Sequence, residues 1–365
     1  NPGIVIQVKD KHKEEVKKIL EDAGIGYVKL GKPTEERHIL VEKGDATYQF
    51  GIDYLRDVWY STSYLLDRKQ SMNGCAKKRF ENYKKQPLEF VFDKSFTGKL
   101  SQFGLNPDRR TPTGIKAAII REKGTNGERE MAYMLYLAGF DVKDVTMTDL
   151  VSGRETLEDI NFIVFCGGFS NSDVLGSAKG WAGAFLFNPK AKAALDNFYA
   201  RKDTLSLGVC NGCQLMIELN LINPDFTKKA KMLHNDSHKF ESKFVGVTVP
   251  MNRSVMFGSL SGSKLGIWVA HGEGKFSLPY HEDKYNVVLK YSYDEYPGNP
   301  NGSDYSVAGL ASPDGRHLAM MPHLERSCFP WQNAYYPADR IKNDQITPWM
   351  EAFVNARKWI EMNKK

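Results

Sequence analysis

The stretch Leu207-Gly208-Val209-Cys210-Asn211-Gly212-Cys213-Gln214 decides how this chain folds and which chemistry it carries. An apolar run at residues 205–209 predicts a buried strand before it, and residues 214–220 predict a helix after it. The glycines on either side of Cys210 permit a sharp strand-to-helix turn, which exposes the sulfur at the edge of the sheet. The following helix directs its positive end at the sulfur and favours the thiolate. The stretch therefore predicts a cysteine nucleophile, with the backbone N–H of Asn211 as a donor to an oxyanion.

Two other interpretations of this stretch stay open. Cys210 and Cys213 form a C-x-x-C pair, which is typical of redox centres and of half a zinc site. A second cysteine pair is missing, because Cys166 and Cys328 stand alone in the sequence, and we expect no metal site. Alternatively, both cysteines are small buried residues of the core.

A nucleophilic cysteine needs a general base and a group that orients this base. His323 and Glu325 are two residues apart, so that on an extended segment their side chains face the same side. Glu325 would then accept a hydrogen bond from one imidazole nitrogen while the other nitrogen faces Cys210. A chance ion pair is the alternative interpretation. A second oxyanion donor is expected from Gly167-Gly168, which follows a predicted buried strand at residues 161–165.

Length and composition limit the class of protein. The chain has 365 residues, which suits two or three domains, and 41% of them are hydrophobic, which excludes wholesale disorder. No apolar run approaches the ~20 residues that span a bilayer, and no signal-peptide pattern is present. Five scattered cysteines fit a reducing cytoplasm better than a disulfide scaffold. Because the sequence starts at Asn1 without a methionine, we expect a piece of a longer protein.

The net charge of +6 lies almost wholly in residues 1–110, which hold 21 basic and 16 acidic residues. Much of it comes from residues 68–85, where seven basic residues accompany one acidic residue, Glu81. Such a run can bind nucleic acid. Since nothing near it resembles a base-reading module, we favour a solvated helical face or a surface that meets another domain. From residue 114 onward, strands alternate with helices, which predicts a parallel sheet covered on both faces.

Several motifs together resemble a known family. GVCNGCQ at residues 208–214, GGFS at residues 167–170 and the H-x-E at residues 323–325 resemble a class I glutamine amidotransferase. HNDSHKFES at residues 234–242 and HGEGKF at residues 271–276 extend the resemblance to the glutaminase region at the C-terminus of the large, single-chain phosphoribosylformylglycinamidine synthases. The resemblance implies a flavodoxin-like three-layer α/β sandwich with a mostly parallel central sheet. It also implies three parts, namely 1–46 as the tail of a synthetase domain, 47–112 as a helical connector and linker, and 113–365 as the glutaminase domain.

The resemblance assigns roles to individual residues. Cys210 would be the nucleophile, His323 the general base and acid, and Glu325 the group that orients His323. The oxyanion would be held by the N–H groups of Gly168 and Asn211. The glutamine pocket is expected to involve Phe169, Ser170, Gln214, Asn235, Ser237, Phe240, Glu241 and His271. The sequence departs from the family pattern at Asn171-Ser172, which stands where Tyr-Gly is usual, and at Leu324, which stands where Pro is usual. Neither departure removes a catalytic group.

The resemblance further implies that L-glutamine is hydrolysed and that the ammonia passes to upstream synthetase domains of the same polypeptide. These convert formylglycinamide ribonucleotide to formylglycinamidine ribonucleotide with ATP in de novo purine biosynthesis. The sequence lacks the phosphate-cradling pattern G-x-x-x-x-G-K-[ST], so ATP and Mg²⁺ are expected upstream and no cofactor in this chain. We expect a cytoplasmic carbon–nitrogen ligase that contacts neither nucleic acid nor membranes. Two alternatives stay open: a non-catalytic amidotransferase-like interaction module, and a flavodoxin-like cysteine hydrolase or redox protein.

Overall fold

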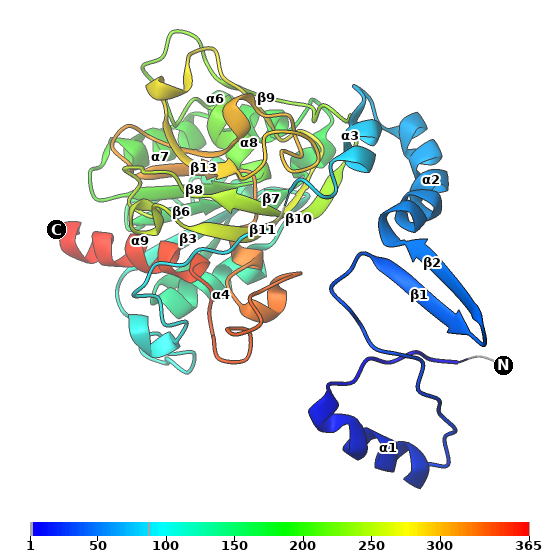
Figure 1. Cartoon of the computed structure of the whole chain (residues 1–365). Coiled ribbons are helices and arrows are strands. Elements are labelled where there is room, and N and C mark those ends of the chain that lie inside the picture. The colour runs from blue at the N-terminus through cyan, green and yellow to red at the C-terminus, as the bar shows by residue number, and fades with distance from the viewer. Residues whose placement is uncertain (1–2, 87, 365) are drawn as a thin grey trace. The chain divides into compact units, whose positions relative to one another are not determined.

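The computed structural model describes residues 3–86 and 88–364, and this part of the chain divides into two compact units. One unit is Asn1–Tyr60 and the other is Ser61–Lys365. Helix α2 (Ile52–Gln70) contains the boundary between them (Figure 1). The domain limits predicted from the sequence, at residues 46 and 112, stay a prediction.

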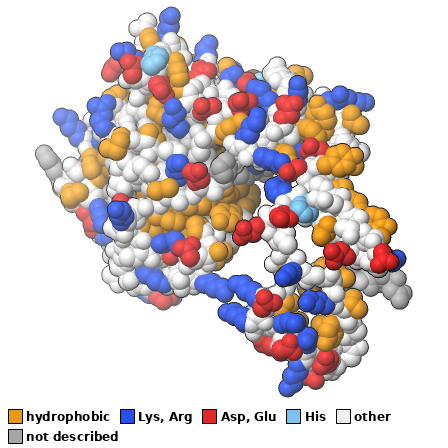
Figure 2. Space-filling model, viewed as in Figure 1, with side chains coloured by type: hydrophobic (Ala, Val, Ile, Leu, Met, Phe, Trp, Pro, Cys, Tyr) orange, Lys and Arg blue, Asp and Glu red, His pale blue; other side chains and the backbone are white. Residues whose placement is uncertain are grey.

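The first unit consists of a helix and a hairpin. Helix α1 (Lys13–Asp22) precedes the antiparallel strands β1 (His38–Lys43) and β2 (Ala46–Gly51). Within the segment expected to be a helical connector, the helix α2 begins only at Ile52, because residues 49–51 pair with β1. Apolar side chains lie on the surface of this unit (Figure 2), and none of residues 3–60 is buried. The unit therefore gains little hydrophobic stabilisation from its own contacts.

The second unit is built around a mixed sheet, nine-stranded within the described residues. Its spatial order is β11-β10-β13-β14-β15-β8-β6-β3-β5, and the pairs from β15 to β5 are parallel whereas those from β11 to β15 are antiparallel. The strands are β3 (Lys116–Arg121), β5 (Asp141–Thr146), β6 (Phe162–Phe165), β8 (Leu205–Val209), β10 (Glu241–Thr248), β11 (Lys264–His271), β13 (Asn286–Tyr291), β14 (Val307–Ala311) and β15 (His317–Met320).

Helices cover both faces of this sheet. Helices α4 (Glu128–Ala138) and α9 (Trp349–Asn363) pack together on one face. Helices α6, α7 and α8 lie on the opposite face (Figure 1), and α5 packs against α6 and α7. Their bounds are α5 (Met147–Ser152), α6 (Lys179–Phe187), α7 (Pro189–Ala200) and α8 (Asn211–Glu218). The predicted three-layer α/β architecture is confirmed, with a sheet whose second half is antiparallel.

The parallel half of the sheet positions the candidate site. Its central strands β6 and β8 are buried along their whole length, as expected for strands covered on both faces. The order β5-β3-β6-β8-β15 reverses between β3 and β6, and ligands of such sheets bind outside the carboxyl ends of the strands at this point. Cys210 follows β8, and the short strand β7 (Gly167–Gly168) follows β6. The stretches at residues 167–170 and 207–214, both singled out in the sequence, thus meet at the carboxyl edge of the sheet.

A buried polar cluster lies at the opposite edge, where β8 and β15 begin. Ser206 Oγ lies 3.0 Å from His317 Nδ1 and 2.8 Å from the Tyr199 hydroxyl. His317 is buried, and burial, followed by the charge of Arg316, lowers its pKa to about 4. The folded protein therefore holds His317 neutral at pH values where the unfolded chain protonates it.

We expect this histidine to make the fold sensitive to acid. Between its unfolded pKa of about 6.5 and its folded pKa of about 4, the unfolded state binds more protons, so that the free energy of unfolding falls as the pH falls. The loss between pH 7 and pH 5 should be about 2 kcal/mol. Urea unfolding at both pH values should show a smaller loss for His317→Gln than for the unaltered chain. The exposed His281, changed to Gln, is the control, and equal losses in all three proteins would contradict the expectation.

Candidate active site

Cys210 occupies a strained turn between β8 and α8. Its φ of 54° and ψ of −107° lie outside the regions that non-glycine residues usually adopt. Its backbone N–H donates to the carbonyl of Met320 (2.9 Å), and its thiol donates to the carbonyl of Ala270 (3.6 Å). The side chain is 4% exposed and borders a cavity. The sharp turn predicted from the sequence is present, with the sulfur at the carboxyl edge of the sheet.

The two glycines beside Cys210 are required by close packing. A Cβ atom on Gly208 would lie 2.5 Å from the carbonyl oxygen of Gly212. A Cβ atom on Gly212 would lie 2.1 Å from the carbonyl oxygen of Phe165. Real Cβ atoms do not approach backbone atoms this closely, so the turn is accessible only to a sequence with glycine at both positions.

His323 lies beside Cys210 and is held by Glu325. A Cβ atom built on Gly167 would meet both side chains, 2.9 Å from His323 Cε1 and 3.3 Å from Cys210 Cβ. His323 Nδ1 lies 2.6 Å from Glu325 Oε1, and each of the two side chains is 2% exposed. Among the described residues, His323 Nε2 has no hydrogen-bond partner. The structure therefore brings Cys210, His323 and Glu325 together.

The segment that carries His323 and Glu325 differs from the predicted extended segment. Glu325 belongs to a 3₁₀ turn, Leu324–Arg326, and this turn folds its carboxylate back towards His323. The backbone N–H of His323 donates to the carbonyl of Trp268 (2.9 Å), which ties the segment to β11. Leu324, which replaces the usual proline, is fully buried in the core.

Electrostatics favours an ionised histidine and glutamate here. Burial by itself lowers the pKa of His323, but the charges of Glu325 and Cys210 outweigh burial and raise it to about 10. For Glu325, burial raises the pKa, but the charge and hydrogen bond of His323 outweigh burial and lower it. The imidazole is thus charged at neutral pH next to the cysteine sulfur.

A cavity of about 190 Å³ opens over Cys210. Four of the residues predicted for a glutamine pocket line it, namely Phe169, Gln214, Phe240 and His271. The rings of Phe169 and Phe240 face each other across 5.9 Å. Its remaining lining residues are Gly168, Asp173, Ser177, Cys210, His234, His238, Lys239, Ala270, Gly272 and Glu273.

The other four predicted pocket residues do not line the cavity. Ser170 and Asn235 are buried behind it, and Asn235 donates to the carbonyl of His271 (2.7 Å). Ser237 donates to Glu241 (2.6 Å), and both are buried outside the cavity. These four residues stabilise the wall of the cavity. Their positions in the sequence motifs do not distinguish them from residues that face the cavity.

The side chain of Asn211 connects the turn at Cys210 to the loop after Gly168, the two segments predicted to hold the oxyanion. Its Oδ1 accepts from the N–H of Ser170 (3.1 Å), and its Nδ2 donates to Gln214 Oε1 (2.9 Å). Gln214 in turn donates to the carbonyl of Glu273 (2.7 Å). Gly168 has a φ of 117°, and a Cβ atom there would lie 2.6 Å from Thr125 Cα, so glycine is required. The oxyanion role of Gly168 and Asn211 stays a prediction.

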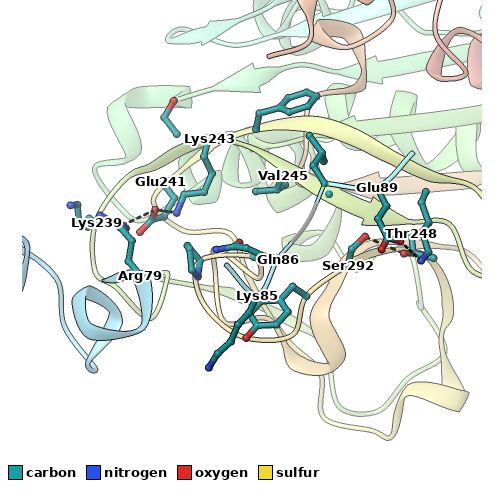
Figure 3. A pocket seen from close by; sticks show the side chains of 18 of the residues that line it. Arg79, Lys85, Gln86, Glu89, Lys239, Glu241, Lys243, Val245, Thr248 and Ser292 are labelled. Atoms are coloured by element: carbon teal, nitrogen blue, oxygen red, sulfur yellow. Dashed lines mark hydrogen bonds and ion pairs between the residues drawn. The ribbon is translucent and has the colours of Figure 1, made fainter. Parts of the chain in front are cut away.

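A charged network ties the cavity wall to residues 67–79. Arg79 lies 3.5 Å from the buried carboxylate of Glu241 (Figure 3). It also lies 3.0 Å from the buried carboxylate of Asp67, which Lys239 reaches at 3.0 Å as well. Lys239 and Phe240 also border a second cavity of about 670 Å³. Arg79, a member of the basic run noted in the sequence, lines the second cavity and stabilises the wall between the two cavities from that side.

We expect Arg79→Met to weaken substrate binding more than turnover. The change leaves Asp67 and Glu241 with one cation fewer and loosens the wall at Lys239. In the glutamine hydrolysis expected from the sequence, KM should rise about tenfold, equal to about 1.4 kcal/mol, while kcat changes less than about twofold. Lys78→Met, on the exposed face of the same helix α3 (Cys75–Glu81), is the control. A fall in kcat at unchanged KM would refute this role.

Six polar residues that line the cavity were not singled out in the sequence, namely Asp173, Ser177, His234, His238, Lys239 and Glu273. Glu273 stands in the HGEG motif and Asp173 three residues after GGFS, so position in the motifs was the only signal. Within the described residues, no group of three or more His, Cys, Asp and Glu side chains is placed to hold a metal ion. None of the helices described there combines the length and apolar character that crossing a bilayer requires.

The sequence of this chain is similar to a known domain family and to two longer proteins. Residues 114–360 match a family of CobB/CobQ-like glutamine amidotransferase domains. The phosphoribosylformylglycinamidine synthase of Homo sapiens is 38% identical over 393 residues, which cover 98% of this chain and 29% of that protein. The probable phosphoribosylformylglycinamidine synthase, chloroplastic/mitochondrial, of Arabidopsis thaliana is 37% identical, over 98% of this chain and 27% of its own length. This chain thus spans less than a third of these relatives.

A solved structure shares the fold. The structure of PurLQS from Thermotoga maritima superposes with a TM-score of 0.51 and 27% sequence identity. The match covers 69% of this chain and 99% of that one.

Proposed function

Because this chain belongs to the family of CobB/CobQ-like glutamine amidotransferase domains, we propose that it hydrolyses L-glutamine at Cys210. The observation that carries the proposal is the placement of three groups. Cys210 stands on a strained turn at the mouth of a cavity, and His323 lies beside it, held 2.6 Å from a buried Glu325. A thiolate paired with an imidazolium is the reactive form of a cysteine nucleophile.

The proposed reaction follows from these positions. The Cys210 thiolate attacks the carboxamide carbon, and the oxyanion that forms accepts hydrogen bonds from the N–H groups of Gly168 and Asn211. His323 protonates the departing ammonia, and a glutamyl thioester remains. His323 then takes a proton from water, which attacks the thioester and releases glutamate. Glu325 keeps the imidazole oriented and balances its charge.

The ammonia is proposed to serve a larger enzyme. Relatives that match 98% of this chain are named phosphoribosylformylglycinamidine synthases, and the chain spans less than a third of them. We propose that upstream synthetase domains of one polypeptide use the ammonia and ATP to convert formylglycinamide ribonucleotide to formylglycinamidine ribonucleotide. ATP and Mg²⁺ would bind in those domains. The unit 1–60, whose apolar side chains lie on its surface, suits the tail of such a domain.

The setting in the cell is proposed to be the cytoplasm, which suits five free cysteines. The redox alternative is not favoured, because Cys213 is fully buried and burial raises its pKa well above the usual value. A module that serves only for docking would not need a histidine and glutamate buried beside a cysteine.

Labelling with a glutamine analogue tests the proposed function. The chain is incubated with 6-diazo-5-oxo-L-norleucine, which alkylates a thiolate that sits at a glutamine carboxamide site. We expect one adduct per chain, on Cys210 by peptide mapping, and L-glutamine should slow its formation. Release of glutamate from L-glutamine should be lost in parallel. Labelling elsewhere, or labelling that glutamine does not slow, would refute the proposal.

A further inference from the structure

The second cavity, of about 670 Å³, lies along β10 and has the size of a small-molecule site. Cys210 does not line it, so it is distinct from the cavity proposed for glutamine. Five basic side chains line it, namely Arg79, Lys85, Lys239, Lys243 and Lys264. We propose that this cavity binds a small phosphate-bearing anion through Lys85, Lys243 and the open backbone edge of β10.

Positive charge exceeds negative charge at this cavity. Four of the five basic side chains form ion pairs within the described part of the chain, whereas Lys85 forms none. Their partners are three carboxylates, those of Asp67, Glu89 and Glu241. The cavity therefore keeps an excess of positive charge, which a bound anion would neutralise.

Lys243 shows how closely the cations are gathered. At one end of the cavity, Arg79, Lys239 and Lys243 lie around Glu241 (Figure 3). The side chain of Lys243 is 21% exposed, and its ammonium group lies 4.6 Å from the centre of the Tyr296 ring. Burial and the nearby charges of Arg79 and Lys239 lower the pKa of Lys243. Its ammonium group has three N–H donors, and the pair with Glu241 at 2.6 Å uses one of them, which leaves donors for an anion.

The backbone of β10 supplies an independent set of donors. β10 pairs with β11 over its whole length, but with β13 only at its last two residues. On the β13 side, the carbonyl of Gly246 accepts from the N–H of Ser292 (3.0 Å). Because peptide groups alternate in direction along a strand, the N–H groups of Ser242 and Phe244 face that same side. Both residues line the cavity, and within the described residues no strand pairs with them there, so their N–H groups can donate to a ligand.

These donors together suit a phosphate group. Its several oxygen atoms can accept from ammonium groups and from peptide N–H groups at the same time, and such charge-assisted hydrogen bonds are the strong ones. Inorganic phosphates and phosphate esters share this chemistry. The rings of Phe240 and Tyr293 also line the cavity and offer apolar surface to the organic part of an ester.

Isothermal titration of the chain with pyrophosphate, AMP and adenosine at low ionic strength tests the site. Pyrophosphate or AMP should bind as one anion per chain, and adenosine, which lacks the phosphate, should not bind. Tighter binding of AMP would identify an ester as the ligand, and tighter binding of pyrophosphate an inorganic anion. Lys85→Met and Lys243→Met should each raise the Kd about tenfold or more, the effect of losing a charged hydrogen bond. Lys229→Met, whose side chain is exposed and does not line the cavity, should change it less than about twofold.

Hydrogen–deuterium exchange locates the bound anion. Saturating pyrophosphate or AMP should slow amide exchange over residues 241–246, which contain the open edge. Because Lys85 is exposed, Lys85→Met should fold normally, and thermal unfolding checks the fold of Lys243→Met.

Three results would overturn the inference. These are binding of adenosine as tight as that of AMP, an equal Kd in the two lysine variants and the Lys229→Met control, and slower exchange with a hexaglutamate peptide but not with either phosphate compound. The last result would make the open edge a docking site for an acidic segment. None of these measurements depends on glutamine turnover, so failure of this inference and failure of the proposed function are distinguishable.

Discussion

Replacing Cys210 by serine is expected to lower kcat for glutamine hydrolysis by about 10⁴-fold or more, the size of loss seen when a nucleophile is removed from a catalytic triad. The serine hydroxyl keeps the position at the cavity but stays protonated, because an alcohol is a far weaker acid than a thiol. Substrate binding should persist, since the cavity walls are unchanged. Glutamate release under saturating glutamine measures the effect, and isothermal titration of the variant with L-glutamine measures binding.

Cys213→Ala is the matched control, because Cys213 is three residues away in the same stretch and fully buried. Its kcat should stay within about threefold of the unaltered chain, with a loss of stability of about 1 kcal/mol from the smaller side chain. If Cys213→Ala were as inactive as Cys210→Ser, a redox pair would replace the nucleophile interpretation. Full activity in Cys210→Ser would refute it outright.

Gly212→Ala should cause a large loss of stability from a single methyl group. The added Cβ would lie 2.1 Å from the carbonyl oxygen of Phe165 and 2.6 Å from its carbonyl carbon. Neither backbone atom can rotate away, so β6 and α8 must separate. We expect a loss of about 3 kcal/mol in the free energy of unfolding, together with loss of glutaminase activity as Cys210 moves.

Gly183→Ala provides a control of the same chemistry in helix α6. Its nearest neighbour would be Phe187 Cδ2 at 3.8 Å, an ordinary contact. Alanine should therefore stabilise this helix by about 0.5–1 kcal/mol, because glycine is the poorer helix former. Thermal unfolding of both variants beside the unaltered chain measures the contrast. Similar melting temperatures for Gly212→Ala and Gly183→Ala would show that the turn yields more readily than its packing indicates.

Local chemistry made much of the candidate site predictable. Two glycines around a cysteine, between an apolar strand and a helix, indicate a sharp turn because few other sequences can adopt one. Parallel strands then bring the end of β6 to the same edge as the end of β8. The pairing of His323 with Glu325 was also expected, but through an extended segment, whereas a 3₁₀ turn makes the contact.

Other features depend on contacts between distant residues and were not predicted. Ser237 and Glu241 belong to a motif near the cavity, yet Glu241 pairs with Tyr296 and Arg79, and Ser237 donates to Glu241. Arg79 looked like one charge in a basic run, but it is half-buried between Asp67 and Glu241. Such roles follow from which side chains a distant segment presents, and spacing along one segment contains no information on that.

The sequence by itself determined the fold class, the family and the cysteine at the turn, because alternating burial and the steric demands of glycine are local properties. Only the tertiary structure decided which motif residues reach the cavity, and it alone brought Asp173 and Glu273 into the lining of one cavity. Which side chains reach the cavity depends on packing across the sheet. There, residues separated by about a hundred positions in the sequence determine how deeply each carboxylate is buried and which charges surround it.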